Sequence, residues 1–240
     1  MLWHKTTGKG PNLVLLHGWG FSSEIFQSLV ERYKQSYRIT VIDLPGHGRS
    51  NDVDGGIDDW CDEIIKLIPD KSTLLGWSLG GLLSIYIASK VTIEHLVLVA
   101  ATPNLVNNNN WKTGMKGDVF HQFASNLKSD STKTLKRFVN LQSNDKTQVK
   151  GLYKAIKKYP PSDSALSIGL DILLNSDLRG IYKSIRAPKS AILGTLDTLV
   201  PDTIENWYKD NNTQTYTLRS GHLPFLDDKF ELPNKFELPS

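Results

Sequence analysis

The sequence contains very little sulfur. Its 240 residues include one cysteine and two methionines. The single cysteine, Cys61, cannot form a disulfide within the chain, and such a composition is typical of the reducing cytoplasm. Cys61 lies in a run of polar and apolar residues with helical spacing, so we expect a buried structural thiol rather than a catalytic one.

Long apolar runs are also absent. The longest, such as 96–101, have the length of a β-strand, and the first twelve residues lack the apolar core of a signal peptide. We therefore expect a cytoplasmic protein with no membrane span. Hydrophobic residues make up 39% of the chain and charged residues 22%, which is typical of a globular domain.

A large excess of one charge is missing as well. The net charge of +3 is too small to favour nucleic acid as a partner. Its distribution is uneven, because the segment from Lys128 to Lys158 holds nine basic and two acidic residues, +7 in all, against −4 for the rest. This segment is a candidate surface for an acidic partner.

What the sequence does contain is an alternation of strands and helices. Short apolar runs with strand character lie at 13–17, 37–44, 72–78 and 95–102. Segments with helical spacing lie between and after them, at 23–35, 57–68 and 80–90. This order predicts an α/β fold with a mostly parallel central sheet and helices on both faces.

The alternation stops near Asn107. From 111 to 184 the chain reads as helical and more polar, and strand patterns return at 189–197 and 213–221. We therefore predict a core in two parts, 1–106 and 186–240, with a helical cap inserted at 107–185. The pentapeptide KFELP occurs twice, at 229–233 and 235–239, and no function is assigned to it.

The candidate nucleophile is Ser78. Residues 76–80, Gly-Trp-Ser-Leu-Gly, fit the pattern G-x-S-x-G at a predicted strand-to-helix junction, where a sharp turn lifts the hydroxyl above the sheet. Glycines at 76 and 80 allow the strand and the helix to approach. A serine that merely caps a helix would occupy the same position, but it would not require both glycines.

The candidate base is His222, because a serine hydroxyl needs a group that accepts its proton. His222 follows the last predicted strand, at the edge where open α/β sheets bind ligands. His47 follows an earlier strand and is the weaker alternative. We expect the remaining histidines to be unrelated to catalysis, including His4, His95 and His121.

The candidate acid is Asp197, which ends a predicted strand at the same edge. A carboxylate there would hold the histidine tautomer and stabilise the imidazolium. Asp202 is the substitute candidate, and Asp43 is a weaker one. A histidine-glycine-tryptophan-glycine run at 17–20 offers the N–H of Trp19 for an oxyanion hole, with the N–H of Leu79 as the second donor.

These motifs together resemble a known family. HGWG, DLPGHGRS, GWSLGG, GTLDTLVP and SGHLPF, in this order, are similar to α/β-hydrolases, whose nucleophile, acid and base follow the order seen here. More narrowly, LVLLHGWG, LLGWSLGGL and RFVNLQ resemble the carboxylesterases of biotin synthesis. Those esterases release methanol from the methyl ester of a pimeloyl group on an acyl carrier protein.

The resemblance implies further roles. It assigns the boundary of the acyl chain to five residues of the cap: Phe138, Val139, Asn140, Leu141 and Gln142. By composition alone this run is an apolar stripe that more often belongs to a core. The resemblance also implies catalysis without a metal or an organic cofactor, and the sequence shows no cluster with metal-ligand spacing.

The partner implied is an acidic acyl carrier protein. The pairs Lys133 with Arg137 and Lys150 with Lys154 have the spacing that places both members on one helix face. A basic cap would steer an acidic partner. Three of these four residues are lysine, which keeps the charge but loses the bidentate fork of arginine. A solvated charged face without a partner explains the same pattern equally well.

The sequence thus predicts a monomeric serine hydrolase that gives pimeloyl-carrier protein and methanol. Two other enzymes share the same motifs: a broad short-chain carboxylesterase, which would take small esters, and a relative that acts in menaquinone synthesis. A binding protein with the same fold and no catalysis belongs to a different class, since fold does not fix function. The complete set of catalytic residues disfavours that last alternative.

Overall fold

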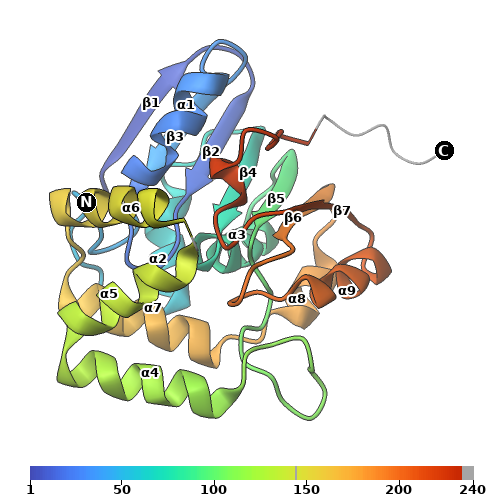
Figure 1. Ribbon diagram of the computed structural model, residues 1–240. Coiled ribbons are helices and arrows are strands. Elements are labelled where there is room, and N and C mark those ends of the chain that lie inside the picture. Colours follow the sequence, from blue (N-terminus) through green and yellow to red (C-terminus); the bar gives the residue numbers. More distant parts are fainter. Residues whose placement is uncertain (144, 234–240) are drawn as a thin grey trace.

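A seven-stranded sheet runs through the computed structural model, which describes residues 1–143 and 145–233 (Figure 1). The strand order is β1-β3-β2-β4-β5-β6-β7. The strands are β1 (His4–Gly8), β2 (Asn12–Leu16), β3 (Arg38–Ile42), β4 (Ser72–Trp77), β5 (His95–Val99), β6 (Lys189–Gly194) and β7 (Thr213–Leu218). All neighbours are parallel except β1 with β3. The predicted mostly parallel sheet is confirmed.

The antiparallel strand β1 was not predicted from the sequence. Its residues, HKTTG, are polar, and all but one are exposed. It lies at the edge of the sheet and pairs only with β3. A strand in this position buries little surface, so it carries no apolar alternation from which it could be recognised.

Both faces of the sheet are buried. In β2, Val14 and Leu16 join the core cluster that contains α2 and α3, whereas Leu13 and Leu15 join the cluster on the side of α1. The helices that cover the sheet are α1 (Gln27–Tyr33), α2 (Ile57–Ile65), α3 (Leu79–Lys90), α8 (Arg179–Ser184) and α9 (Glu205–Asp210). Short 3₁₀ helices are η1 (Ser23–Phe26), η2 (Asp202–Ile204) and η3 (Pro224–Leu226). Helices on both faces are therefore confirmed.

Four further helices lie between β5 and β6: α4 (Gly117–Ser129), α5 (Ser131–Gln142), α6 (Lys146–Lys158) and α7 (Asp163–Asn175). They gather on the left and lower side of the sheet in Figure 1, and we call them the cap helices. The predicted cap, 107–185, also includes α8. However, α8 packs against α3, and its Tyr182 contacts Tyr208 of α9, so α8 covers the sheet. The domain limits themselves stay a prediction. In the part of the chain described, no helix is long and apolar enough to cross a membrane.

Polar side chains cap the N-termini of three of the cap helices. Asp130 accepts a hydrogen bond from the N–H of Lys133 at 2.8 Å, and Asp145 accepts one from the N–H of Thr147 at 2.7 Å. These two aspartates are the only acids of the basic segment. The basic residues of the segment outnumber these two aspartates by nine to two, so its net charge is positive.

Candidate active site

Ser78 occupies a strained turn between β4 and α3. Its backbone has φ 55° and ψ −117°, a conformation that L-residues rarely adopt. The turn brings the strand very close to the helix, since a Cβ at Gly76 would lie 2.3 Å from the carbonyl oxygen of Gly80. A Cβ at Gly80 would lie 2.3 Å from the carbonyl oxygen of Leu16. The close approach that the two glycines predict is confirmed, and it gives the geometry of a nucleophile elbow.

The loops after β6 and β7 bring Asp197 and His222 together. The His222 Nδ1 lies 2.7 Å from the Asp197 Oδ2. The other carboxylate oxygen accepts the N–H groups of Leu199 at 2.8 Å and Val200 at 3.1 Å, which fixes its orientation. A carboxylate at Nδ1 favours the tautomer that carries its proton there and leaves Nε2 as the acceptor. Asp197, not Asp202, is therefore the partner of His222.

The Nε2 atom of His222 is buried and has no hydrogen-bond partner among the residues described. His222 and Ser78 line the same cavity. An unpaired acceptor on a histidine that faces the cavity of a serine is the arrangement required of a general base. The three residues from three separate strand ends thus meet at one place, although their catalytic roles stay a prediction.

Two neighbours hold the backbone of His222. Its N–H donates to the carbonyl oxygen of Gln142 at 3.2 Å, and its own carbonyl oxygen accepts the Trp77 indole N–H at 2.7 Å. Gln142 is the last residue of α5, so the end of a cap helix contacts the loop of the candidate base. Sequence reasoning missed this contact, since neither Gln142 nor Trp77 carries a signal of it.

The candidate oxyanion hole lies beside Ser78. Neither the Trp19 N–H nor the Leu79 N–H donates to a protein acceptor within the described ranges. Leu79 is the first residue of α3, where N–H groups are free and the helix dipole favours negative charge. The Trp19 side chain lines the cavity, and its indole N–H donates to the Leu166 carbonyl oxygen at 2.8 Å.

Buried histidines hold the loop that carries Trp19. The Gly20 N–H donates to His47 Nε2 at 3.2 Å, and the Leu44 N–H donates to His17 Nε2 at 2.9 Å. The other ring nitrogen of each histidine lies 2.9 Å from a backbone carbonyl oxygen. Burial lowers the pKa of His17 and lowers that of His47 to about 3. Both rings are neutral and fully engaged, so His47 is a structural residue and not an alternative base.

The carboxylate of Asp43 is also engaged in structural hydrogen bonds. Its carboxylate accepts the N–H of Ser23 at 2.8 Å and both the N–H and the Nε–H of Arg49 at 2.9 Å. Burial opposes ionisation of Asp43, but these hydrogen bonds and nearby charges leave its pKa below the ordinary value. Asp43 therefore stabilises the loop between β3 and α2 and has no free oxygen for catalysis.

The other candidates lie away from the cavity. Cys61 is buried, and burial raises its thiol pKa, which confirms a structural thiol. His95 lies in β5 with its Nε2 3.0 Å from the Ser190 hydroxyl, His4 lies in β1, and His121 is exposed on α4. None of them lines the cavity that holds Ser78. No cluster of three or more potential metal ligands occurs among the residues described.

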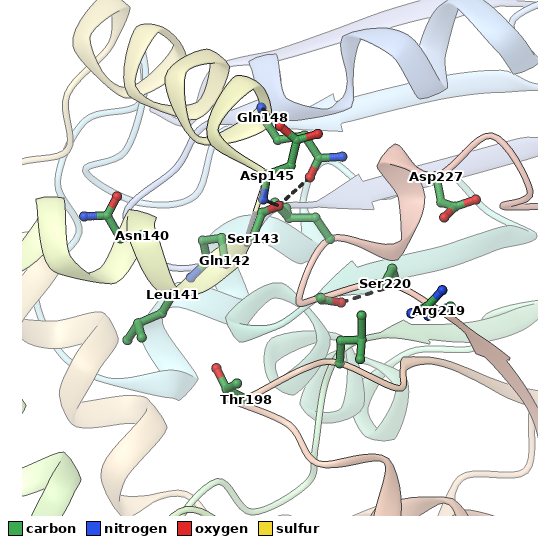
Figure 2. Close-up of a pocket in the computed structure, with 13 residues that line it drawn as sticks. Asn140, Leu141, Gln142, Ser143, Asp145, Gln148, Thr198, Arg219, Ser220 and Asp227 are labelled. Carbon is green, nitrogen blue, oxygen red and sulfur yellow. Dashed lines mark hydrogen bonds between the residues drawn. The ribbon is translucent and has the colours of Figure 1, made fainter.

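The cavity itself has a volume of about 450 Å³ and mostly apolar walls. Of the five cap residues implied by the resemblance, Phe138, Asn140 and Leu141 line it. Val139 does not, because it is fully buried in the core cluster beside α1. Gln142 does not line it either and belongs to a neighbouring, more polar pocket (Figure 2).

Sequence reasoning missed several of the walls. They come from α4 with the segment before it and from α7, and they include Leu105, Met115, Phe120, Phe123, Leu170 and Leu173. The spacing of Phe120, Phe123 and Leu127 on α4 is an amphipathic signal. The sequence could not show that this apolar stripe faces a cavity rather than a core.

The four predicted docking residues are exposed on two neighbouring helices. Lys133 and Arg137 lie on α5, and Lys150 and Lys154 lie on α6. Arg137 also lines the active-site cavity, which places one positive charge at its wall. Contact with a carrier protein stays a prediction.

Comparisons with known proteins agree with this fold. A family model described as the alpha/beta hydrolase family matches residues 13–232, and the chain belongs to that family. Among solved structures, an esterase from Exiguobacterium antarcticum superposes with a TM-score of 0.87 at 21% identity, covering 95% of this chain and 91% of that one. A bromoperoxidase from Bacillus anthracis gives 0.84 at 20% identity, covering 92% and 88%. These likenesses show the fold.

Curated relatives are more similar in sequence. The chain is 32% identical to the pimeloyl-[acyl-carrier protein] methyl ester esterase of Pseudoalteromonas atlantica, covering 92% of this chain and 91% of the relative. It is 36% identical to the protein of the same name from Nitrosomonas europaea, covering 92% of both. The relative of that name from Legionella pneumophila is 35% identical, with 91% and 90% covered.

Proposed function

We propose that the protein is a serine hydrolase that cleaves the methyl ester of pimeloyl-[acyl-carrier protein] in biotin biosynthesis. The observation that carries the catalytic part is the unpaired, buried Nε2 of His222 in the cavity of Ser78, with Asp197 bound to the opposite nitrogen. The substrate part is supported by the curated relatives, which are pimeloyl-[acyl-carrier protein] methyl ester esterases and which the chain matches over nearly their whole length.

In the first proposed step, His222 takes the proton of the Ser78 hydroxyl while its oxygen attacks the ester carbonyl carbon. Negative charge develops on the carbonyl oxygen and is stabilised by the N–H groups of Trp19 and Leu79. The imidazolium of His222 then gives its proton to the departing methanol. Asp197 stays ionised and stabilises the imidazolium.

In the second step, water attacks the acyl-enzyme with His222 again as the base, and the pimeloyl group leaves with a free carboxylate. Only protein groups and water take part, so the proposed reaction needs no cofactor. The strained backbone of Ser78 supports both steps, because a sharp strand-to-helix turn of this kind lifts the hydroxyl above the sheet.

The shape and charge around the site support a long acyl chain on a carrier protein. The cavity is walled by apolar side chains such as Phe123, Phe138 and Leu170, which suit a hydrocarbon chain. Arg137 at the cavity wall and the exposed lysines of α5 and α6 attract an acidic partner. We propose that Lys133, Arg137, Lys150 and Lys154 contact that partner.

The catalytic assignment is tested by Ser78→Ala. We expect hydrolysis of p-nitrophenyl butyrate to fall at least about 10⁴-fold, since removal of a serine nucleophile costs on the order of 10⁶ in comparable enzymes. A fluorophosphonate probe should label the parent protein and not the variant. Ser89→Ala, on the same helix, is the control. Labelling or turnover at the parent level in Ser78→Ala would refute the assignment.

The substrate assignment is tested by comparing pimeloyl-carrier-protein methyl ester with p-nitrophenyl acetate and butyrate at low and high salt. We expect a higher kcat/KM for the carrier substrate, and this preference should shrink as salt screens the basic helices. Equal turnover of the free esters, indifferent to salt, would instead assign a broad carboxylesterase. Turnover of a menaquinone-pathway intermediate alone would assign the third alternative.

We further propose that the enzyme is a cytoplasmic monomer that also accepts small esters. A lone buried thiol such as Cys61 suits a reducing compartment. Light scattering of the purified protein should give a mass near the 26.9 kDa of one chain. A mass twice as large contradicts the monomer.

A further inference from the structure

The active-site cavity opens to solvent between α4 and α5. At its inner end, the lining residues Trp19 and His222 each have an exposed fraction of only 1%. The lining residues that are exposed all belong to the two helices: Val119, Gln122, Arg137, Asn140 and Leu141. We call this opening the mouth of the cavity. An acyl chain whose ester lies at Ser78 therefore extends past buried apolar walls and ends at the mouth.

Polar side chains gather at the mouth. Apart from Ser78 and His222, the lining residues with an amide or charged side chain are Gln122, Asn126, Arg137 and Asn140. All four lie on α4 or α5, and none of them is acidic. The cavity is thus apolar along its length and rich in hydrogen-bond donors where it opens.

Two of these amides have an engaged oxygen and an available NH₂ group. The Oδ1 of Asn126 accepts the side-chain N–H of Gln122 at 3.2 Å. The hydroxyl hydrogen of Tyr153 on α6 is shared between the Oδ1 of Asn140 at 3.2 Å and the carbonyl oxygen of Lys136 at 2.8 Å. In residues 1–143 and 145–233, neither asparagine NH₂ group donates to a protein acceptor. One donor from α4 and one from α5 are therefore available to a ligand at the mouth.

The far end of the acyl chain determines what these donors meet. A dicarboxylic chain has a second carbonyl group at its far end, and a carbonyl oxygen accepts hydrogen bonds from amide NH₂ groups. A fatty acyl chain ends in a methyl group, which would displace water from the amides without replacing its hydrogen bonds. The mouth therefore favours the first kind of chain and disfavours the second.

We propose that Asn126 and Asn140 select acyl chains that carry a carbonyl oxygen at the end distant from Ser78. This inference rests on the proposed function, because it requires an ester at Ser78, and it identifies the part of the acyl group that determines specificity. The two NH₂ groups donate to the distant oxygen. Methyl esters of α,ω-dicarboxylic acids are then preferred over fatty acid methyl esters of the same length.

The test compares dimethyl pimelate with methyl nonanoate, two uncharged methyl esters with the same number of chain atoms. For the parent protein we expect a higher kcat/KM, counted per ester group, for dimethyl pimelate. Asn126→Leu and Asn140→Leu should each lower the ratio of the two kcat/KM values by about threefold to tenfold, the contribution of one neutral hydrogen bond. Both variants should hydrolyse methyl nonanoate faster than the parent does, because leucine extends the apolar wall.

Two further variants serve as comparisons. Asn110→Leu makes the same substitution at an exposed asparagine outside the cavity and should leave the ratio at the parent value. Arg137→Gln asks whether the guanidinium recognises the distant oxygen instead. A ratio that is unchanged in both Asn126→Leu and Asn140→Leu overturns the proposal, and so does a ratio that falls in Arg137→Gln alone. Continued hydrolysis of methyl nonanoate shows that each variant is folded.

Failure of the proposed function has a different signature. Neither ester is attached to a carrier, so the ratio does not depend on a preference for carrier-bound substrate. If both esters are hydrolysed and the ratio is insensitive to the asparagines, only the selection fails. If neither is hydrolysed, the proposed function fails, and calorimetry with Ser78→Ala decides on the selection. Adding Asn140→Leu should then weaken the binding of dimethyl pimelate and not that of methyl nonanoate. Equal changes for the two esters overturn the selection independently of turnover.

Discussion

The loop that carries Trp19 and the cap helix α5 line the same cavity, yet they are held by different forces. The loop is fixed by buried hydrogen bonds from its own backbone to His47 and by the neighbouring bond between His17 and Leu44. Helix α5 begins at an exposed N-cap, Asp130, and its exposed face carries solvated charges.

This difference predicts unequal responses to substitution. A buried hydrogen bond is costly to break because water cannot replace it, so changes in the network around the Trp19 loop should cost much stability. The exposed charges of the cap helices interact weakly and are screened by salt, so changes among them should cost little. Four predictions test this contrast.

The largest effect is expected at Arg49, which links the buried core to the cap helix α6 through Glu24. Arg49 lies 2.9 Å from the fully buried Asp43 and 3.3 Å from Glu24, and Glu24 also pairs with Lys158 of α6 at 2.8 Å. Arg49→Met leaves the Asp43 carboxylate buried without its partner, at a cost of about 3–5 kcal/mol. Lys158→Met should change the unfolding free energy very little, since Lys158 is exposed. Urea denaturation checks both, and equal losses would contradict the contrast.

Glycine-to-alanine substitutions in the core and in the cap should change the free energy of unfolding in opposite directions. In Gly76→Ala the new methyl group would lie 2.3 Å from the Gly80 carbonyl oxygen, and we expect a loss of about 3 kcal/mol with inactivation. In Gly151→Ala on α6 it would meet nothing within 4 Å, and we expect a gain of about 0.5–1 kcal/mol. Thermal unfolding gives both values. A stable, active Gly76→Ala protein would contradict the close approach.

Acid should destabilise the core through its buried histidines. Because the folded pKa of His47 is about 3 against 6.5 when unfolded, only the unfolded state takes up the proton between those values. Stability is unaffected above pH 6.5 and falls by about 1.4 kcal/mol per pH unit below it, for this residue alone. His47→Gln should flatten the measured slope between pH 6 and 4, whereas His121→Gln, on an exposed cap residue, should leave it unchanged.

The smallest effect concerns the strain at Ser78. Both Ser78→Ala and Ser78→Gly remove the nucleophile, but only glycine adopts φ 55° without strain. We expect the glycine variant to be the more stable by about 1 kcal/mol. At Ser89, inside α3, the alanine variant should be more stable than the glycine variant, because glycine is unfavourable in a helix. The same order at both positions would argue against strain at Ser78.

The residues of the candidate site could be found from the sequence because each has a local signature. Ser78 lies between two obligatory glycines, Asp197 follows the fully buried strand β6, and His222 follows the last strand, β7. Such patterns arise from short-range geometry, which the order of residues determines directly. The mostly parallel sheet was predictable for the same reason, since strands buried on both faces are continuously apolar.

What could not be predicted depends on contacts between distant segments. The burial of Val139, the bond from His222 to Gln142 and the engagement of His47 by Gly20 join residues with no shared pattern. The edge strand β1 is polar because it buries little, so nothing in HKTTG distinguishes it from a loop. The cavity walls on α4 look like an ordinary core face, because an apolar stripe is the same whether it meets protein or substrate.

The two aspartates that begin α5 and α6 have a consequence for engineering. Asp130 and Asp145 cap the N-termini of these helices, whereas the side chains of the basic residues take no part in the caps. Different positions therefore control the formation of these helices and the sign of their surface charge. A designer could therefore invert the charge of this face without redesigning the fold beneath it.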